Sequence, residues 1–218
     1  MKILLIIALG FIVNIPLSGQ NIPMSVKNFE AINVTIEEVT YQSKNAIRLK
    51  EITNDQESIA LVKDIQFTDG TIETELAGRT LPSANATARG FIGIAFRVNS
   101  EDSIRYDCFY IRPTNGRADD QVRRNHSTQY IAHPAFPWFR LRKEFPGMYE
   151  SYVDLVEGEW TKIKIEVNGK QAKLYVHDSD QPVLIINNLL NSKSSGGIAL
   201  WNGQGTEGYF RNLKITKK

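Results

Sequence analysis

The chain has 218 residues, 42% of them hydrophobic, and its 26 lysines and arginines nearly balance its 24 aspartates and glutamates. The formal net charge of +2 argues against bulk electrostatic binding to nucleic acid or to a membrane surface, so no nucleic-acid partner is expected. The single cysteine, Cys108, excludes an intrachain disulfide bond and a cysteine-based zinc site, and its apolar, aromatic neighbours predict a buried thiol.

Residues 1–19 have the pattern of a secretory signal peptide. A lysine precedes the apolar run Ile3–Val13, which is followed by a small-residue end at Pro16–Gly19. We expect cleavage after Gly19, an exported chain of residues 20–218, and a secreted or periplasmic location. The apolar run is too short for a stable bilayer span and no later apolar stretch is long enough, so no membrane span is predicted.

The remainder of the chain is expected to form a single domain built from β-strands. β-Branched residues in partial alternation with polar ones predict strands over residues 32–41, 46–52, 58–62, 71–76, 90–98, 104–112, 160–167, 171–177, 182–187, 197–201 and 209–216. Asn168-Gly169 joins two of these strands and predicts a two-residue hairpin turn, with Ile163, Ile165 and Val167 facing inward. No segment shows helical periodicity over about a dozen residues.

Strands joined by short turns, without alternating helices, predict an all-β fold, a two-sheet antiparallel jelly-roll sandwich. Each of two packed sheets buries one face and leaves the other free. A free face that is concave is the natural place for a ligand groove.

The segment Arg112–Asp154 interrupts the strand pattern, and we interpret it as an insertion that carries a binding or catalytic site. Between Arg112 and Lys143 it holds seven basic and two acidic residues, which points to an anionic ligand such as a uronic acid or a sulfated sugar. Its candidate ligand-binding residues are Arg117, Asp119, Asp120, Arg123, Arg124, Asn125, Trp138 and Arg140. The alternative is that the charged residues pair with one another and that the aromatic residues form the small core of a long loop.

His126 and His133 in the same segment titrate near neutrality, so either could act as a general acid or base. Asp119 and Asp120 could join backbone carbonyls around calcium, but a complete calcium-loop motif is missing, and the sequence predicts no cofactor and no metal. Trp201, outside the segment, is either a platform for a sugar ring or a partly buried structural residue.

The hairpin that precedes this segment offers a second set of candidates. If its two strands pair about a central turn, three charged residues share a face with two small ones and line the floor of a sugar groove: Arg97, Arg105 and Asp107 beside Gly93 and Ala95. A register slip of one residue would reverse the face of the second strand.

Two stretches resemble a known superfamily. FTDGTIETEL at Phe67–Leu76 and GGIALWNGQGTEGYFRNLKI at Gly196–Ile215 are similar to the concanavalin A-like lectins and glucanases, and among these to the 3-keto-disaccharide hydrolase domain, described as glycoside-hydrolase-16-like. The resemblance implies a jelly roll and association with carbohydrate. Family-16 glucanases carry three acidic residues at alternate strand positions, of which Glu73 and Glu75 fill two, and we favour a solvated strand face for this pair.

These features lead to three hypotheses about function. The first is a secreted, lectin-like protein that binds a glycan, with acidic or modified sugars as ligands. The alternative is an enzyme of the 3-keto-disaccharide hydrolase-like type that cleaves glycosidic bonds by hydrolysis or elimination. In that case His126 or His133 would be acid or base, and Arg123 or Arg124 would neutralise developing charge. The third is an extracellular module that binds another protein through exposed aromatic residues.

Overall fold

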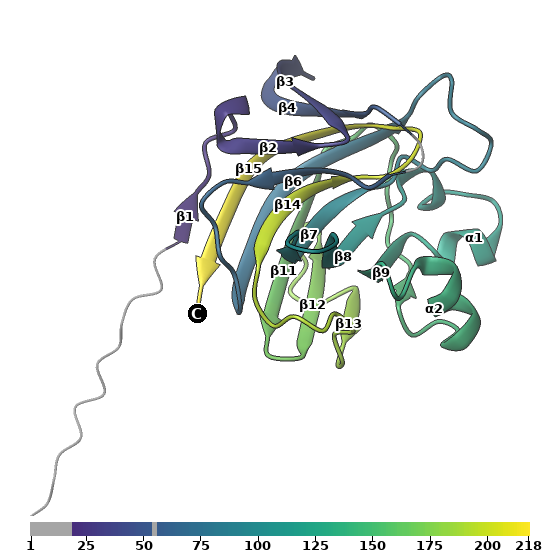
Figure 1. Cartoon of the computed structure of the whole chain (residues 1–218). Helices are drawn as coiled ribbons and strands as arrows, with labels where there is room; N and C mark the ends of the chain where they lie inside the picture. Colours follow the sequence, from purple (N-terminus) through teal and green to yellow (C-terminus); the bar gives the residue numbers. More distant parts are fainter. Residues whose placement is uncertain (1–18, 54–55) are drawn as a thin grey trace, which may run out of the picture.

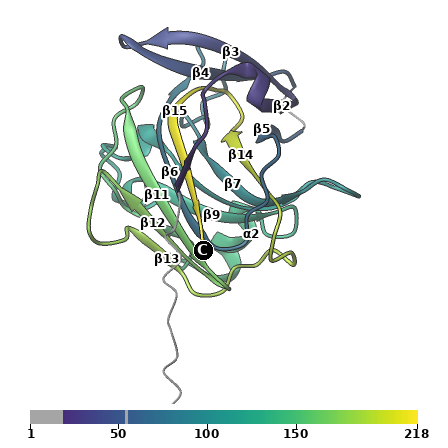
Figure 2. The same ribbon diagram turned by 90° about the vertical axis from the view of Figure 1, so that its left-hand side faces the viewer.

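A computed structural model describes residues 19–53 and 56–218, so the predicted signal peptide lies outside the described residues apart from Gly19. Two antiparallel sheets pack face to face around a common core (Figures 1 and 2). The predicted all-β jelly-roll sandwich is confirmed. None of the described helices is long and apolar enough to cross a bilayer.

The eight-stranded sheet has the order β13-β12-β11-β6-β15-β4-β3, with β1 paired to β15. The long strand β15 lies between β6 and β4 and pairs with both. The strands of this sheet are β1 (Gly19–Asn21), β3 (Val34–Tyr41), β4 (Lys44–Glu51), β6 (Gly70–Thr80), β11 (Thr161–Asn168), β12 (Gln171–Val176), β13 (Leu184–Ile186) and β15 (Thr206–Lys217).

The seven-stranded sheet has the order β10-β9-β8-β7-β14-β5-β2. Its strands are β2 (Phe29–Ile32), β5 (Ser58–Val62), β7 (Ile92–Asn99), β8 (Arg105–Ile111), β9 (Thr128–His133), β10 (Glu150–Ser151) and β14 (Gly197–Asn202). Beside β9 lie two helices, α1 (Gln121–Asn125) and α2 (Trp138–Glu144), and the two 3-10 turns are η1 (Val26–Asn28) and η2 (Pro113–Asn115) (Figure 1). The helices have five and seven residues, which is too short for hydrophobic periodicity to reveal them.

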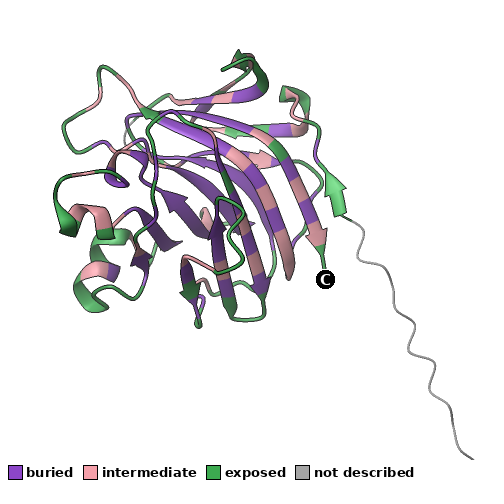
Figure 3. Cartoon of the chain, turned by 180° about the vertical axis from the view of Figure 1, so that it is seen from behind, coloured by how far each residue is buried: buried purple, intermediate pink, exposed green. Residues whose placement is uncertain are grey.

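The core fills the space between the sheets because each strand turns alternate apolar side chains inward. Figure 3 shows buried residues along the strands of both sheets, whereas exposed residues gather in the turns and around the two helices. On β11, Ile163, Ile165 and Val167 are buried, as predicted. Ile94 and Phe96 of the opposite sheet belong to the same cluster.

The hairpin between β11 and β12 is confirmed, but its turn lies one residue later than predicted. Asn168 pairs with Gln171, so the two turn residues are Gly169 and Lys170. Gly169 has a φ of 58°, which glycine adopts without strain.

The hairpin of β7 and β8 has a register one residue away from the predicted one. Tyr110 pairs with Gly93 and Cys108 with Ala95, so these four residues share a face. Asp107 therefore points to the opposite side, into the core, where it is fully buried. The predicted face for Asp107 is wrong because a slip of one residue reverses every side chain of a strand.

A bulge near the end of β7 accompanies this register. Arg97 lies within it and has a φ of 54°. Its buried guanidinium donates hydrogen bonds to the carbonyl oxygens of Thr68 and Gly169 and pairs with Asp69 at 3.1 Å. Arg97 therefore ties the hairpin to the end of the eight-stranded sheet, and the groove floor predicted from it is not formed.

The segment Arg112–Asp154 is only partly an excursion from the sandwich. The helices α1 and α2 lie outside the sheets, but β9 pairs along its length with β8, and β10 pairs with β9. Strand β9 was not predicted because its six residues are surrounded by polar and charged residues that obscure its alternation. Its pairing brings His133 opposite Tyr106.

Candidate functional site

A cavity of about 330 Å³ opens on the outward face of the seven-stranded sheet. Its floor comes from β8, β9 and β14, one wall from the connection between β4 and β5, and the other wall from the start of α2. We call it the sheet cavity, and it is lined by Glu51, Gln56, Glu57, Ser58, Phe91, Tyr110, Ile131, His133, Pro137, Trp138, Phe139, Trp201, Asn202, Gly203 and Gln204.

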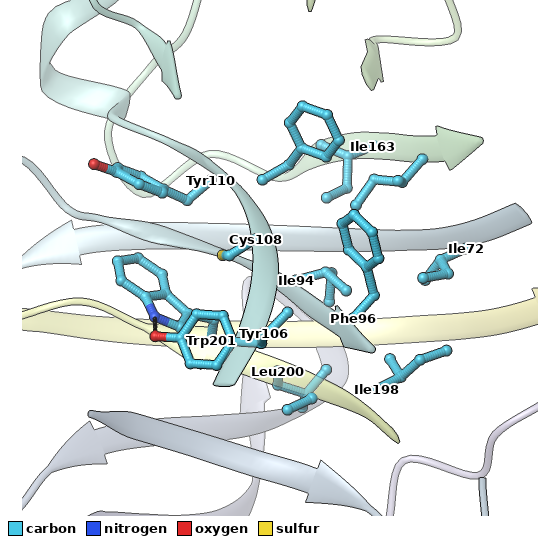
Figure 4. Packing of buried hydrophobic residues seen from close by; sticks show 14 of the residues in the cluster. Ile72, Ile94, Phe96, Tyr106, Cys108, Tyr110, Ile163, Ile198, Leu200 and Trp201 are labelled. Atoms are coloured by element: carbon cyan, nitrogen blue, oxygen red, sulfur yellow. Dashed lines mark hydrogen bonds between the residues drawn. The ribbon is translucent and has the colours of Figure 1, made fainter. Parts of the chain in front are cut away.

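Gly93 leaves room for two aromatic rings at the base of the sheet cavity. It lies on β7 between Tyr110 and Trp201 and pairs with both. Because Gly93 has no side chain, the two rings meet with centroids 4.8 Å apart and planes inclined by 28° (Figure 4). A Cβ atom at Gly93 would lie 2.1 Å from the carbonyl oxygen of Phe109. Glycine is therefore required for the close strand pairing as well as for the stacked floor.

Glu57 is the most constrained carboxylate of the sheet cavity. Its Oε2 accepts hydrogen bonds from the hydroxyl of Tyr106 and from Nε1 of Trp201, the latter at 3.2 Å. Trp201 Nε1 also lies 3.0 Å from the Tyr106 hydroxyl, as drawn in Figure 4. The donors around Glu57 therefore hold its side chain in one position at one side of the floor.

His133 completes this arrangement from β9. Its Nδ1 lies 3.3 Å from Oε1 of Glu57, and its ring stacks on Tyr106 at 5.0 Å between centroids. Burial lowers the pKa of His133, while the charge of Glu57 acts in the opposite direction. Burial thus favours the neutral imidazole, which lies beside the Glu57 carboxylate.

Glu51 is the second carboxylate of the sheet cavity, and its surroundings differ. Its Oε1 accepts one hydrogen bond, at 2.6 Å, from the backbone amide of Gly205. Burial raises the pKa of Glu51, and this hydrogen bond only partly opposes the shift. The cavity thus contains one carboxyl group with several donors and another that burial moves toward its protonated form.

Trp138 at the start of α2 forms the wall that faces the floor, and its indole ring is 44% exposed. The guanidinium of Arg142 lies 4.9 Å from the centre of its ring and that of Arg112 lies 5.8 Å away. Arg112 is buried and donates to the hydroxyl of Tyr110 at 2.8 Å. Cations against the ring of a tryptophan attract it, so the two arginines fix the wall relative to the floor.

Glu150 on β10 is the common anion of these cations. Its Oε2 lies 2.8 Å from Nη2 of Arg142, 2.8 Å from Nδ1 of His126 and 3.8 Å from Nη1 of Arg112. Burial lowers the pKa of His126, and the two arginines add to that effect while Glu150 opposes it. Glu150 therefore neutralises a buried basic cluster directly behind the Trp138 wall.

The two predicted histidines do not meet. His133 lines the sheet cavity, whereas His126 lines a second cavity of about 520 Å³ beyond α2. The second cavity is lined by Val122, Asn125, His126, Arg142, Pro146, Gly147, Glu150, Ser151 and Tyr152. Among the predicted site residues, the sheet cavity brings together His133, Trp138 and Trp201 only.

The other predicted arginines bind to the protein itself. Arg117 forms two hydrogen bonds of 2.8 Å with Asp154, and Arg140 pairs with Glu144 at 2.9 Å. The remaining contacts are hydrogen bonds from Arg123 to Asn115 and Thr114, from Arg124 to Ala118 and Tyr152, and from Arg105 to Ser103. These arginines therefore fit the alternative interpretation, in which the charged residues of the segment pair with one another and hold the loop together.

The remaining polar candidates of the segment also have local partners or face solvent. Asp120 caps α1, since its Oδ1 accepts from the amide of Arg123 at 2.6 Å, and Asn125 accepts from Gln121 at 2.7 Å. Asp119 is exposed. Over residues 19–53 and 56–218, no three or more His, Cys, Asp or Glu side chains are grouped so as to hold a metal ion.

Glu73 and Glu75 lie on the outer face of the eight-stranded sheet. Glu73 pairs with Lys214 at 3.2 Å, and Glu75 lies 3.6 Å from Arg211 and 3.8 Å from Lys44. The interpretation as a solvated strand face is therefore correct, and these carboxylates do not reach the sheet cavity.

Sequence reasoning missed Glu57, Glu51 and Tyr110. In the sequence YDCFY of β8, aromatic residues occupy both faces, so only the register shows that Tyr106 and Tyr110 point outward. Glu51 and Glu57 flank the short connection between β4 and β5, and nothing in their local sequence indicates that it crosses the edge of the other sheet.

Comparisons with known proteins inform the fold. No protein-family model and no curated protein matches the sequence. Carbohydrate-binding module CBM66 from Bacillus subtilis is similar in structure, with 16% identity, a TM-score of 0.59, and coverage of 87% of this chain and 96% of that chain. The exoplasmic/lumenal domain of VIP36, in its Ca²⁺/Man3GlcNAc-bound form, has 9% identity and a TM-score of 0.55 over 92% of this chain and 88% of that one. Peanut lectin has 9% identity and a TM-score of 0.51 over 93% and 97%. These similarities show that the chain shares the jelly-roll fold of these proteins.

Proposed function

We propose that this protein binds carbohydrate, with a sugar ring seated in the sheet cavity. The observation that carries the proposal is the aromatic lining of the cavity. Tyr110 and Trp201 stack on each other and are largely buried at its base, and Trp138 of α2 presents an exposed side chain at its wall. A pyranose ring has apolar C–H faces that pack against aromatic rings. The volume of about 330 Å³ falls in the range of small-ligand sites. The neighbours in structure include a carbohydrate-binding module, the VIP36 domain in its Ca²⁺/Man3GlcNAc-bound form and peanut lectin, which supports the same function.

Polar groups around this floor suit the hydroxyl groups of a sugar. Glu57 offers a carboxylate that accepts hydrogen bonds, Gln56 and Gln204 offer amides, and Ser58 offers a hydroxyl. Flat apolar surfaces with a few convergent polar groups are typical of a site that orients one small ligand.

The charge of the sheet cavity favours neutral sugars over acidic ones. No lysine or arginine is among the described residues that line it, whereas Glu51 and Glu57 are. The basic residues of the segment Arg112–Asp154 are paired instead, for example Arg117 with Asp154. A uronic acid or sulfated sugar would place a second anion beside Glu57, which is unfavourable.

We also propose that the protein is exported, on the strength of the pattern in residues 1–19. The check is expression of the full chain in a bacterium, followed by fractionation and N-terminal sequencing. We expect a mature protein outside the cytoplasm that begins at Gln20. A full-length chain that remains in the cytoplasm would show that the pattern is not a signal peptide.

The binding proposal is tested on a glycan array that contains neutral, acidic and oxidised sugars. We expect Trp138→Ala to weaken binding of the best glycan by tenfold or more, because loss of a ring contact of about 1.5 kcal/mol corresponds to roughly that factor. Phe145→Ala is the matched control, since Phe145 is 36% exposed at the end of the same helix and does not line the sheet cavity. Calorimetry measures both affinities.

Two results would count against the proposal. If no glycan is retained on the array, the sheet cavity does not bind carbohydrate and the protein-interaction hypothesis gains support. If Phe145→Ala and Trp138→Ala weaken binding equally, the ligand lies elsewhere on α2. Preference for a uronic acid or a sulfated sugar would contradict the expected selectivity for neutral sugars but not the binding of carbohydrate in the sheet cavity.

A further inference from the structure

The two carboxyl groups of the sheet cavity have unlike surroundings, and we propose that this cavity hydrolyses a glycosidic bond with Glu51 as general acid and Glu57 as general base. The inference rests on the proposed function, because it places the sugar in the same cavity. It differs from the sequence hypothesis, in which histidines were the acid and base.

Glu57 is a carboxylate held in one position by its neighbours. Tyr106 and Trp201 donate to its Oε2, and His133 approaches its Oε1 at 3.3 Å. The two donors hold Oε2, so Oε1, on the side of His133, is the oxygen that takes a proton from water. These contacts also fix its position over the floor formed by Trp201.

Glu51 has the surroundings of a carboxyl group that can carry a proton. It lies at the end of β4, beside the Gly203 and Gln204 rim, and its one hydrogen bond comes from the backbone amide of Gly205. Burial raises the pKa of Glu51, as required of a group that must be protonated before it acts.

The reaction balances with water as the only other reactant. Glu51 gives its proton to the glycosidic oxygen as the bond from that oxygen to the anomeric carbon breaks. A water molecule forms the new bond to the anomeric carbon from the opposite side and loses a proton to Glu57. Exchange with solvent then returns Glu51 to its protonated form and Glu57 to its ionised form.

His133 is a positioning residue in this arrangement. Its ring stacks on Tyr106 while its Nδ1 faces Glu57, so it supports the base without contacting the reacting atoms. His126 takes no part, because it lies in the second cavity with Glu150.

The test uses the full chain with two kinds of probe. One is a set of reduced oligosaccharides of glucose, galactose, mannose, xylose and arabinose, and the other is the 4-nitrophenyl glycosides of the same sugars in both anomeric forms. We expect the wild-type protein to hydrolyse at least one probe of each kind, and the first product to have the inverted anomeric configuration by NMR. Binding is measured in parallel on the glycan array.

The variants separate the two roles. Glu57→Gln should lose hydrolysis of both kinds of probe by roughly 100-fold or more and still bind glycan. Glu51→Gln should lose hydrolysis of oligosaccharides to a similar extent but retain most activity on 4-nitrophenyl glycosides, because nitrophenolate leaves without a proton. Glu73→Gln is the control, since Glu73 lies on the other sheet, and it should keep the wild-type rate.

Each contrary result is informative. Glycan binding without any hydrolysis would overturn this inference and leave the proposed function intact, whereas neither binding nor hydrolysis would overturn both. Hydrolysis that is insensitive to Glu57→Gln, or a retained anomeric configuration, would overturn the assignment of Glu57 as base. If Glu57→Gln fails to fold, as judged by circular dichroism, Glu57→Asp replaces it. This substitution keeps the carboxylate but shortens the side chain, and the same loss of hydrolysis is expected.

Discussion

Asp107 is a carboxyl group enclosed by the core of the sandwich. The hydroxyl of Tyr130 donates to its Oδ1 at 2.5 Å, and the backbone amide of Asn191 does so at 3.2 Å, while Oδ2 has no hydrogen-bond partner. Burial raises the pKa of Asp107 to about 6, despite the opposing effects of these donors and of Arg97. A carboxylate in such a position destabilises the fold once it is ionised.

This predicts an unusual dependence of stability on pH. Because the pKa of Asp107 is about 6 in the folded protein and 3.8 in the unfolded chain, its stabilising contribution is complete below about pH 4 and is lost as the pH rises through 6. Asp107→Asn mimics the protonated acid, so the variant should match the wild type at pH 4 and exceed it by about 3 kcal/mol at pH 7. Urea denaturation at both pH values measures the difference. A difference in unfolding free energy that does not change with pH would contradict the prediction.

At the residue level, the sequence indicates which aromatic and titratable residues could form a site, but not which of them lie together in the folded protein. Trp138, Trp201 and His133 were found because stacking surfaces and an imidazole have recognisable chemistry. Glu51 and Glu57 could not be found, since their role depends on a loop that crosses from one sheet to the other. Many predicted arginines were equally plausible by composition, and only their partners show that they hold the segment together.

Helix α2 is an element whose position depends on charge. It has seven residues, too few to be stable alone, and it buries a single residue, Leu141. Arg142 on α2 and Arg112 next to β8 both reach Glu150 on β10. The helix, and with it the Trp138 wall, is thus attached to the sheet through one shared carboxylate.

Glu150→Gln should therefore destabilise the protein. Removing the anion leaves the buried Arg112 and its neighbour Arg142 without compensation, and breaking a buried pair in this way costs about 3 kcal/mol. Glu144→Gln is the matched control, because its pair with Arg140 is exposed and should change the unfolding free energy by less than about 0.5 kcal/mol. Thermal and urea unfolding monitored by tryptophan fluorescence measures both. Equal effects of the two substitutions would mean that Glu150 does not hold α2.

For strands, the alternation of apolar and polar residues was enough to predict which face is buried when the other face is solvated, as in β11. For β7 and β8 it predicted the strands correctly but not their register, which is interrupted by the bulge at Arg97. It also failed for β9, because the polar and charged residues around this short strand obscure its alternation.

For the molecule as a whole, the jelly roll was predictable because its class depends on the number and spacing of strands, and small errors at strand ends do not change it. The candidate site was not, because the lining of the sheet cavity comes from segments between Glu51 and Gln204 that meet only in three dimensions. Predicting it would have required the register of each pair of strands.

The order of strands has a consequence for how the protein is made. β14 lies between β7 and β5, and β15 lies between β6 and β4, so Gly197–Lys217 joins the two halves of both sheets. A nascent chain that has not yet reached these residues has four strands with unpaired backbone edges, which favours aggregation unless a chaperone covers them. Folding must then wait for synthesis to pass Lys217. Such a delay is compatible with the proposed export, because a translocation channel threads an unfolded chain.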